Sequence, residues 1–241
     1  MLKLSLLLGA IAALADVAGG FVLVKAGGVQ RYLRYFVALG AGFLMATSVL
    51  EMLPESLKLD AKLAPVLVMA GYCAVHFLEH TINAHFHFGE ETHRGEFVSI
   101  RTSYSVLGGL AIHALFDGVA IGSGFALSSA LGWLIFLAIL LHKVPEGFTM
   151  ASVMLASGAS RSTALFSAVV LAATTLLGVL VMGIVPGLVR FGLPVSAGVA
   201  LYVAATDLVP EVNREPGIRM ALVFFAGVAG FLLLQTLLPQ V

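Results

Sequence analysis

The sequence predicts an all-α, polytopic membrane protein, and two observations carry this prediction. Of the 241 residues, 60% are hydrophobic and 11% are charged, whereas soluble domains carry about 25% charged residues. The hydrophobic residues also form eight apolar stretches, each near the roughly 20 residues that a helix needs to cross a bilayer. The net charge of zero gives no sign of a nucleic-acid partner, and the single cysteine, Cys73, excludes an internal disulfide framework. We therefore expect eight transmembrane helices in a lipid bilayer.

The eight expected spans follow one another along the whole chain with mostly short connections. They are residues 2–24, 33–53, 63–82, 104–126, 131–157, 163–185, 190–210 and 218–238. The first begins Met-Leu-Lys, which could open a signal peptide, but its apolar run continues without a clear cleavage site and indicates a retained span. We expect one transmembrane domain over residues 1–241, with a histidine-bearing loop at about 83–103.

The distribution of lysine and arginine predicts the orientation. The connections after the first, third, fifth and seventh spans contain Lys25, Arg31, Arg34, Arg94, Arg101, Arg161, Arg214 and Arg219, and the opposite side holds Lys3, Lys58, Lys62 and Arg190. Because positive residues collect on the cytoplasmic side of a membrane, we expect both termini outside and the long loop in the cytoplasm. That loop holds His85, His87 and His93; it could bind metal loosely, or it could be a polar loop with no specific role.

A five-residue pattern recurs near the ends of the second and seventh spans. The second ends Glu51-Met-Leu-Pro-Glu55 and the seventh ends Asp207-Leu-Val-Pro-Glu211, on opposite faces of the membrane in the expected topology. An inverted repeat of spans 1–3 and 6–8, with spans 4 and 5 between them, would produce this arrangement. Acidic residues at an outer mouth (Glu51, Glu55) and an inner mouth (Asp207, Glu211) could concentrate cations along a pathway. They could equally be solvated helix ends.

Two histidine–carboxylate pairs lie in the middle of the fourth and fifth spans. His113 precedes Asp117, and His142 precedes Glu146, by four residues each, so each pair occupies one face of a helix. Counted from the connection between the spans, the two pairs overlap in height near the middle of the membrane. Ionisable groups at that depth need a partner, a water-filled cavity or a bound cation. Two imidazoles and two carboxylates suit zinc, with iron, manganese or cadmium as further candidates, although a buried structural ion-pair network is the alternative.

At these residues the sequence resembles the ZIP (Zrt/Irt-like) family of divalent metal transporters, of the prokaryotic type. The most specific marks are His-x-x-x-Asp-Gly at 113–118 and His-x-x-Pro-Glu-Gly at 142–147. The resemblance implies a 3+2+3 bundle that transports metal into the cytoplasm, with His113, Asp117, His142 and Glu146 as the primary metal site. It implies zinc as transported substrate rather than cofactor. A homodimer is one option, and a bacterial inner membrane is the default localisation.

The sequence also departs from the family pattern. Many relatives have an Asn directly after the first histidine and an acid directly after the second, which together form a second metal site; here these positions are Ala114 and Lys143. A further family acid falls near Thr175. Alanine cannot ligate a metal, and a lysine ammonium repels a second cation. We therefore expect one metal ion, with Lys143 in place of the second.

Two other functions use the same residues. A zinc-dependent intramembrane hydrolase would keep three protein ligands and an open position, but the sequence contains no His-Glu-x-x-His motif. A proton-relay transporter without metal would use the same histidine and aspartate side chains. Metal-dependent uptake without lipid or peptide turnover would separate these alternatives from metal transport.

Overall fold

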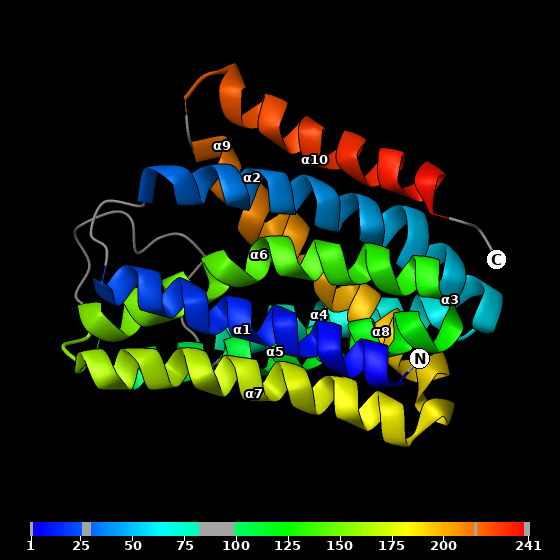
Figure 1. Ribbon diagram of the computed structural model, residues 1–241, viewed down its shortest axis with the longest axis horizontal. Coiled ribbons are helices and arrows are strands. Elements are labelled where there is room, and N and C mark those ends of the chain that lie inside the picture. The colour runs from blue at the N-terminus through cyan, green and yellow to red at the C-terminus, as the bar shows by residue number, and fades with distance from the viewer. Residues whose placement is uncertain (1, 26–29, 82–98, 215, 239–241) are drawn as a thin grey trace.

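The computed structural model describes residues 2–25, 30–81, 99–214 and 216–238, and in this part of the chain the secondary structure is helical. The helices are α1 (Leu2–Lys25), α2 (Gln30–Thr47), α3 (Leu53–Leu59), α4 (Ala64–Thr81), α5 (Ile100–Leu127), α6 (Ser129–Ala156), α7 (Arg161–Ile184), α8 (Val189–Tyr202), α9 (Val209–Arg214) and α10 (Ile218–Leu237). The long helices run roughly parallel or antiparallel and form one elongated bundle (Figure 1). The all-α prediction is confirmed for the described residues.

Seven helical segments in the described ranges are long and apolar enough to cross a membrane. They correspond to every expected span except the third. That span forms α4 (Ala64–Thr81), which has the expected position but ends in the polar residues His76, Glu79 and His80, and these reduce its mean hydropathy. The expected loop at 83–103 lies largely outside the described residues, and so do His85, His87 and His93.

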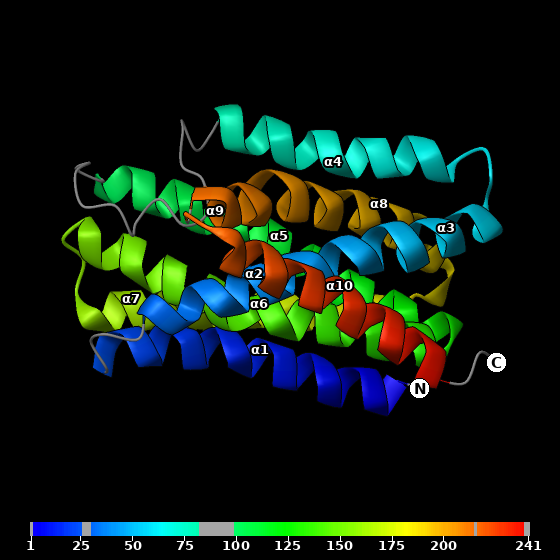
Figure 2. The same ribbon diagram turned by 90° about the horizontal axis from the view of Figure 1, so that it is seen from above.

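The helices pack most extensively in a few pairs. Helix α5 packs against α7, and α1 packs against both α6 and α7, while α4 lies along α8 and α2 lies along α10. The two views place α4 and α10 at the edges of the bundle and α5 and α6 inside it (Figures 1 and 2). Helix α6 is the most buried of the spans. The helices that carry the two histidine–carboxylate pairs are therefore central in the bundle.

Glycines bring the central helices into backbone contact. A Cβ atom added to Gly147 of α6 would lie 1.9 Å from the carbonyl oxygen of Asp16 on α1, and one on Gly118 of α5 would lie 1.9 Å from the carbonyl oxygen of Thr175 on α7. Small residues allow such close approach between transmembrane helices. Because Gly118 and Gly147 each follow an acidic residue, this packing also fixes the height of Asp117 and Glu146.

The second and seventh spans both contain a π-helical turn immediately before the recurring Pro-Glu pair. One turn is η1 (Ser48–Met52), which includes Glu51, and the other is η4 (Val203–Leu208), which includes Asp207. Each helix then continues past its proline as α3 or α9, several residues beyond the expected ends at 53 and 210. A proline lacks a backbone donor and is tolerated at the start of a helical segment, so the wider turn accommodates it without ending the span. This shared local structure supports the inverted repeat, which remains a prediction.

Different helices lie at the two ends of the bundle. The first turn of α1 and the last turn of α10 lie at the same end, close to α3, whereas α9 lies toward the other end (Figures 1 and 2). The first and last helices start and end at the same side of the bundle when the chain crosses the bundle an even number of times. Which end faces the cytoplasm remains a prediction from the positive residues.

Candidate metal centre

Helices α5 and α6 form a hairpin that brings the two histidine–carboxylate pairs together. Ser128 connects them: its backbone N–H donates to Gly124 at the end of α5, and its hydroxyl accepts from the N–H of Leu131 at the start of α6. Because a single residue joins these two antiparallel helices, the turn determines which residues of α5 and α6 lie at the same height in the bundle. The side chains of His113, Asp117, His142 and Glu146 are all at least 95% buried.

The four side chains offer ligand atoms that all lie within 4.8 Å of one another. His113 Nε2 and His142 Nε2 each lie 3.3 Å from Asp117 Oδ2, and His113 Nε2 lies 3.9 Å from Glu146 Oε2. Zinc binds nitrogen and oxygen ligands at about 2.0–2.2 Å, which separates tetrahedral ligands by about 3.3–3.6 Å. The observed spacing is therefore close to that of a divalent metal site.

The ring of His142 is oriented so that its ligating nitrogen points into the cluster. His142 Nδ1 lies 2.9 Å from the carbonyl oxygen of Ala138, and because a carbonyl can only accept, Nδ1 carries the proton in this contact. Nε2 then presents a lone pair toward Asp117. A backbone carbonyl commonly orients a metal-binding histidine in this way. Two acceptors facing each other at 3.3 Å are stabilised by a cation between them.

Other acceptors in the same cluster have no hydrogen-bond partner among the described residues. These include Glu146 Oε1, and His113 Nδ1 is likewise without a partner. Buried polar atoms are costly when left unpaired. An unpaired carboxylate oxygen of Glu146, beside the Nε2 atoms that both histidines direct at Asp117, fits a divalent cation better than a closed structural hydrogen-bond network.

Lys143 lies directly beside this cluster of two histidines and two carboxylates. Its Nζ lies 2.7 Å from Glu146 Oε2 and 2.9 Å from Asp117 Oδ2, and the side chain is completely buried. The ammonium therefore bridges one carboxylate from each helix. It does not extend to the membrane surface.

A third carboxylate reaches the same lysine from α1. Asp16 Oδ2 lies 3.5 Å from Lys143 Nζ, and Asp16 is fully buried. In the sequence Asp16 is a lone acidic residue in an apolar span, so no spacing pattern identifies it. Only the packing of α1 against α6 brings it to the cluster.

The other two positions that depart from the family pattern offer no ligand here. Ala114 is buried among apolar side chains such as Val106 and Met150. The hydroxyl of Thr175 donates to the carbonyl of Leu171 on its own helix. The absence of a second metal site remains a prediction.

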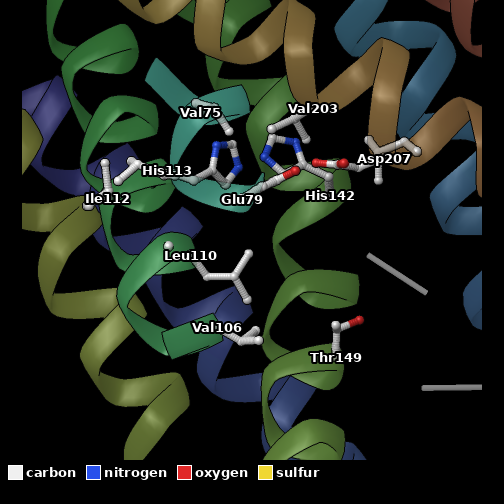
Figure 3. Close-up of a pocket in the computed structure, with 13 residues that line it drawn as sticks. Val75, Glu79, Val106, Leu110, Ile112, His113, His142, Thr149, Val203 and Asp207 are labelled. Atoms are coloured by element: carbon white, nitrogen blue, oxygen red, sulfur yellow. The ribbon is translucent and has the colours of Figure 1, made fainter. Parts of the chain in front are cut away.

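A pocket leads from the two histidines toward α4 and the seventh span. It is lined by His113, His142, Glu79 and Asp207 together with apolar residues, and the close-up shows the two imidazoles facing each other there (Figure 3). Asp207, expected at the inner mouth, is 4% exposed and lies in the wall of this pocket. Glu79 was not predicted as a site residue; it accepts a hydrogen bond of 2.8 Å from the Tyr202 hydroxyl.

The remaining acidic residues lie away from the central cluster. Glu51 and Glu55 line a separate cavity with Lys58 and Ser128, beside the connection between α5 and α6. Glu51 Oε1 accepts a hydrogen bond of 2.6 Å from Gln235, and Glu55 forms an ion pair with Lys58.

Glu211 forms an ion pair with Arg214 at 3.4 Å on α9. These positions agree with two mouths at different ends of the bundle.

Comparisons with known proteins point to one family. Residues 89–235 match the family described as ZIP Zinc transporter. The human zinc transporter SLC39A7 is 31% identical over 163 residues, which cover 63% of this chain and 34% of the human protein. Zinc transporter zipt-7.1 of Caenorhabditis briggsae is 31% identical over 107 residues, covering 42% of this chain and 27% of the relative. Zinc transporter ZIP9 of Micropogonias undulatus is 28% identical over 160 residues, covering 61% and 51%. This chain thus spans between about a quarter and a half of the length of these relatives.

Proposed function

Because this chain belongs to the ZIP zinc transporter family, we propose that it carries divalent metal ions, zinc foremost, across a membrane into the cytoplasm. It is a multi-pass membrane protein. Iron, manganese and cadmium are further candidate substrates, since the same nitrogen and oxygen ligands accept them. The metal is the transported substrate, and the proposal requires no cofactor.

One observation carries this proposal: four ligand atoms from two adjacent helices converge within 4.8 Å in the interior of the bundle. His113 and Asp117 come from α5, and His142 and Glu146 come from α6. A dehydrated zinc ion is costly in a low-dielectric interior, and two carboxylates with two neutral imidazoles replace its water ligands. Such a site binds the ion between the two faces of the membrane.

The site holds a single ion in this proposal. Lys143 supplies, next to Asp117 and Glu146, the positive charge that a second metal would supply in relatives with two ions. Its three ion pairs, with Asp117, Glu146 and Asp16, support this role. A second divalent ion at that place would meet direct repulsion from the ammonium.

The acidic residues outside the cluster define the proposed pathway. Glu51 and Glu55 attract cations at the outer mouth, and Asp207 then receives the ion from His113 and His142 through the shared pocket. Glu211 lies at the inner mouth. Both termini are outside in this proposal, since the end of the bundle with α9 carries more of the basic residues.

The proposal extends to the setting of the whole chain. Residues 1–241 form one transmembrane domain whose cytoplasmic loop at about 83–103 carries histidines, the membrane is a bacterial inner membrane, and a homodimer is one candidate assembly. Hydrolysis is the second candidate function for the same residues. The family and the named relatives are zinc transporters, which favours transport over hydrolysis.

The test is uptake by purified protein in proteoliposomes, with zinc, iron, manganese and cadmium supplied in turn. We expect time-dependent accumulation of zinc, and we expect His142→Ala or Glu146→Ala to reduce the initial rate by more than the roughly 10–100-fold that loss of an outer-shell partner of a metal ligand costs. Ser5→Ala on α1 serves as the control, because the Ser5 hydroxyl donates its hydrogen bond to the carbonyl of Leu2 on its own helix. Wild-type rates in both ligand variants would refute the site. Turnover of lipid or peptide without uptake would favour the hydrolase.

A further inference from the structure

We infer that Asp16 sets the net charge of the metal site and thereby matches it to one divalent ion. The inference rests on the proposed function, because it concerns the same site. Asp16 does not need to touch the metal. It acts through Lys143, which it contacts from α1.

The geometry separates Asp16 from the four ligands. Its Oδ2 atom lies 3.5 Å from Lys143 Nζ, whereas the same Nζ lies 2.9 Å from Asp117 and 2.7 Å from Glu146. The side chain of Asp16 has no exposed surface, and neither of its oxygens accepts a hydrogen bond from the residues that the structure describes. The interaction of this fully buried carboxylate with Lys143 is therefore mainly one of charge.

The packing of α1 fixes this carboxylate beside the lysine. Gly147 of α6 lies against the backbone of Asp16, and Gly19 of α1 lies against the backbone of Val144 of α6, where an added Cβ would be 2.1 Å from the Val144 carbonyl oxygen. The two helices thus touch at Val144 and Gly147, one and four residues after Lys143. A carboxylate so constrained cannot move away to water.

The charges around the lysine balance a single divalent ion. Asp16, Asp117 and Glu146 contribute three negative charges and Lys143 contributes one positive charge, so two negative charges remain when both imidazoles are neutral. One divalent ion neutralises the cluster completely. Without Asp16, Lys143 would cancel one of the two ligand carboxylates, and the site with its ion would carry an uncompensated positive charge in a low-dielectric interior.

This arrangement assigns different roles to residues of the same charge. Asp117 and Glu146 bind the ion, whereas Asp16 is a positioning and counter-charge residue. The prediction that distinguishes these roles is compensation: removing Asp16 and Lys143 together leaves two negative charges, as in the unaltered protein. Removing a ligand carboxylate together with Lys143 cannot restore binding, because a ligand atom is lost.

The experiment measures zinc binding by calorimetry on the full-length detergent-purified protein. All variants carry His85→Ala, His87→Ala and His93→Ala so that the loop does not contribute. We expect Asp16→Asn to raise the Kd for zinc at least about tenfold, as removal of a unit charge from a partly desolvated site does. Asp16→Asn with Lys143→Gln should bind more tightly than Asp16→Asn alone and within about threefold of the unaltered protein. Ser5→Ala, a buried change on the same helix, is the control.

The possible results test either the counter-charge role of Asp16 or the metal site itself. An unchanged Kd in Asp16→Asn, or losses that simply add in the double variant, would overturn the counter-charge role, since a purely structural aspartate gives no compensation. If Asp16→Asn alone does not fold, the double variant decides by the same threefold criterion. Absence of zinc binding in the background protein would instead refute the metal site itself, and so it is distinguishable from failure of this inference.

Discussion

At the scale of single residues, Lys143 is the side chain that most changes the chemistry of the cluster. It is completely buried and forms ion pairs with carboxylates from three helices. A fixed ammonium needs no release from the site when metal passes, unlike a second metal ion.

The first prediction concerns stoichiometry. Protein with the loop histidines replaced should bind about one zinc ion per chain in the membrane region, because Lys143 and Ala114 exclude a second site. Lys143→Asp combined with Ala114→Asn should add a second ion, since it restores an acid and an amide beside the histidines. Metal analysis after gel filtration measures both values. Two ions bound by the protein with unaltered Lys143 and Ala114 would contradict the prediction.

The residues of the site differ in how far the sequence could identify them. His113, Asp117, His142 and Glu146 form pairs four residues apart, and this spacing is visible without a structure because a helix places both members on one face. Asp16 has no such partner nearby in the sequence, and Glu79, although it lies between His76 and His80, is not four residues from either histidine. Their positions depend on contacts of α1 with α6 and of α4 with the seventh span, which the hydrophobic pattern does not encode.

At the scale of helices, glycine contacts determine how closely the central elements pack. Gly147→Ala should destabilise the protein by about 1–3 kcal/mol, since the new methyl group would meet the backbone of Asp16. Zinc affinity should fall with it, because α1 must move away from Lys143. Thermal unfolding in detergent and calorimetry measure the two effects. Gly108→Ala on α5 is the matched control, as an added Cβ there meets no atom within 4 Å, and equal stability of both variants would contradict the prediction.

An ion pair at the α3–α4 turn predicts a pH dependence of stability. Asp60 Oδ1 accepts hydrogen bonds from the N–H groups of Leu63 and Lys62, and Asp60 Oδ2 lies 3.0 Å from an Arg190 nitrogen. The N–H of Leu63, together with these other contacts, holds the pKa of Asp60 below its usual value. Since the pKa is lower in the folded state, the ionised carboxylate stabilises the fold above the unfolded pKa, and this contribution disappears as the pH falls through the folded pKa.

Asp60→Asn tests this linkage because asparagine keeps an acceptor for the backbone but loses the charge. We expect a decrease of a few degrees at most in Tm at neutral pH, since the pair is solvent-exposed. The difference from the unaltered protein should stay constant from neutral pH down to about pH 5 and shrink below about pH 4. Thermal unfolding measured across this range provides the comparison. A difference that stays constant with pH would show that charge is not its cause.

The spans themselves were predictable because their signal is long and compositional. Helix α6 begins at Ser129 and ends at Ala156, within two residues of the expected range 131–157. The second and seventh spans extend further than expected because Pro54 and Pro210 follow π-helical turns. A proline in a sequence favours a helix end, and only the structure reveals the wider turn that accommodates it.

At the scale of the whole molecule, the chain has acidic residues at three heights: Glu51 with Glu55, the central cluster, and Glu211 on α9. Asp207 lies in the wall of the pocket that His113 and His142 also line, beside His142 (Figure 3). An ion moving through this series would exchange ligands stepwise and would never be fully dehydrated without a carboxylate nearby. The two recurring Pro-Glu segments would then act at opposite ends of one pathway.

The last prediction uses this difference between the ends. Glu51→Gln retains a side chain that can hydrogen-bond Gln235 but removes a charge from the outer cavity, so it should raise the KM for zinc supplied from outside several-fold with little change in maximal rate. Asp207→Asn removes a charge from the far side of the histidines, so it should lower the maximal rate by slowing release and leave the outer KM nearly unchanged. Initial uptake rates over a range of zinc concentrations, in proteoliposomes of known protein orientation, measure both quantities. If the two variants gave the same small effect, these acidic residues would be solvated helix ends, and the pathway would have to follow another route through the bundle.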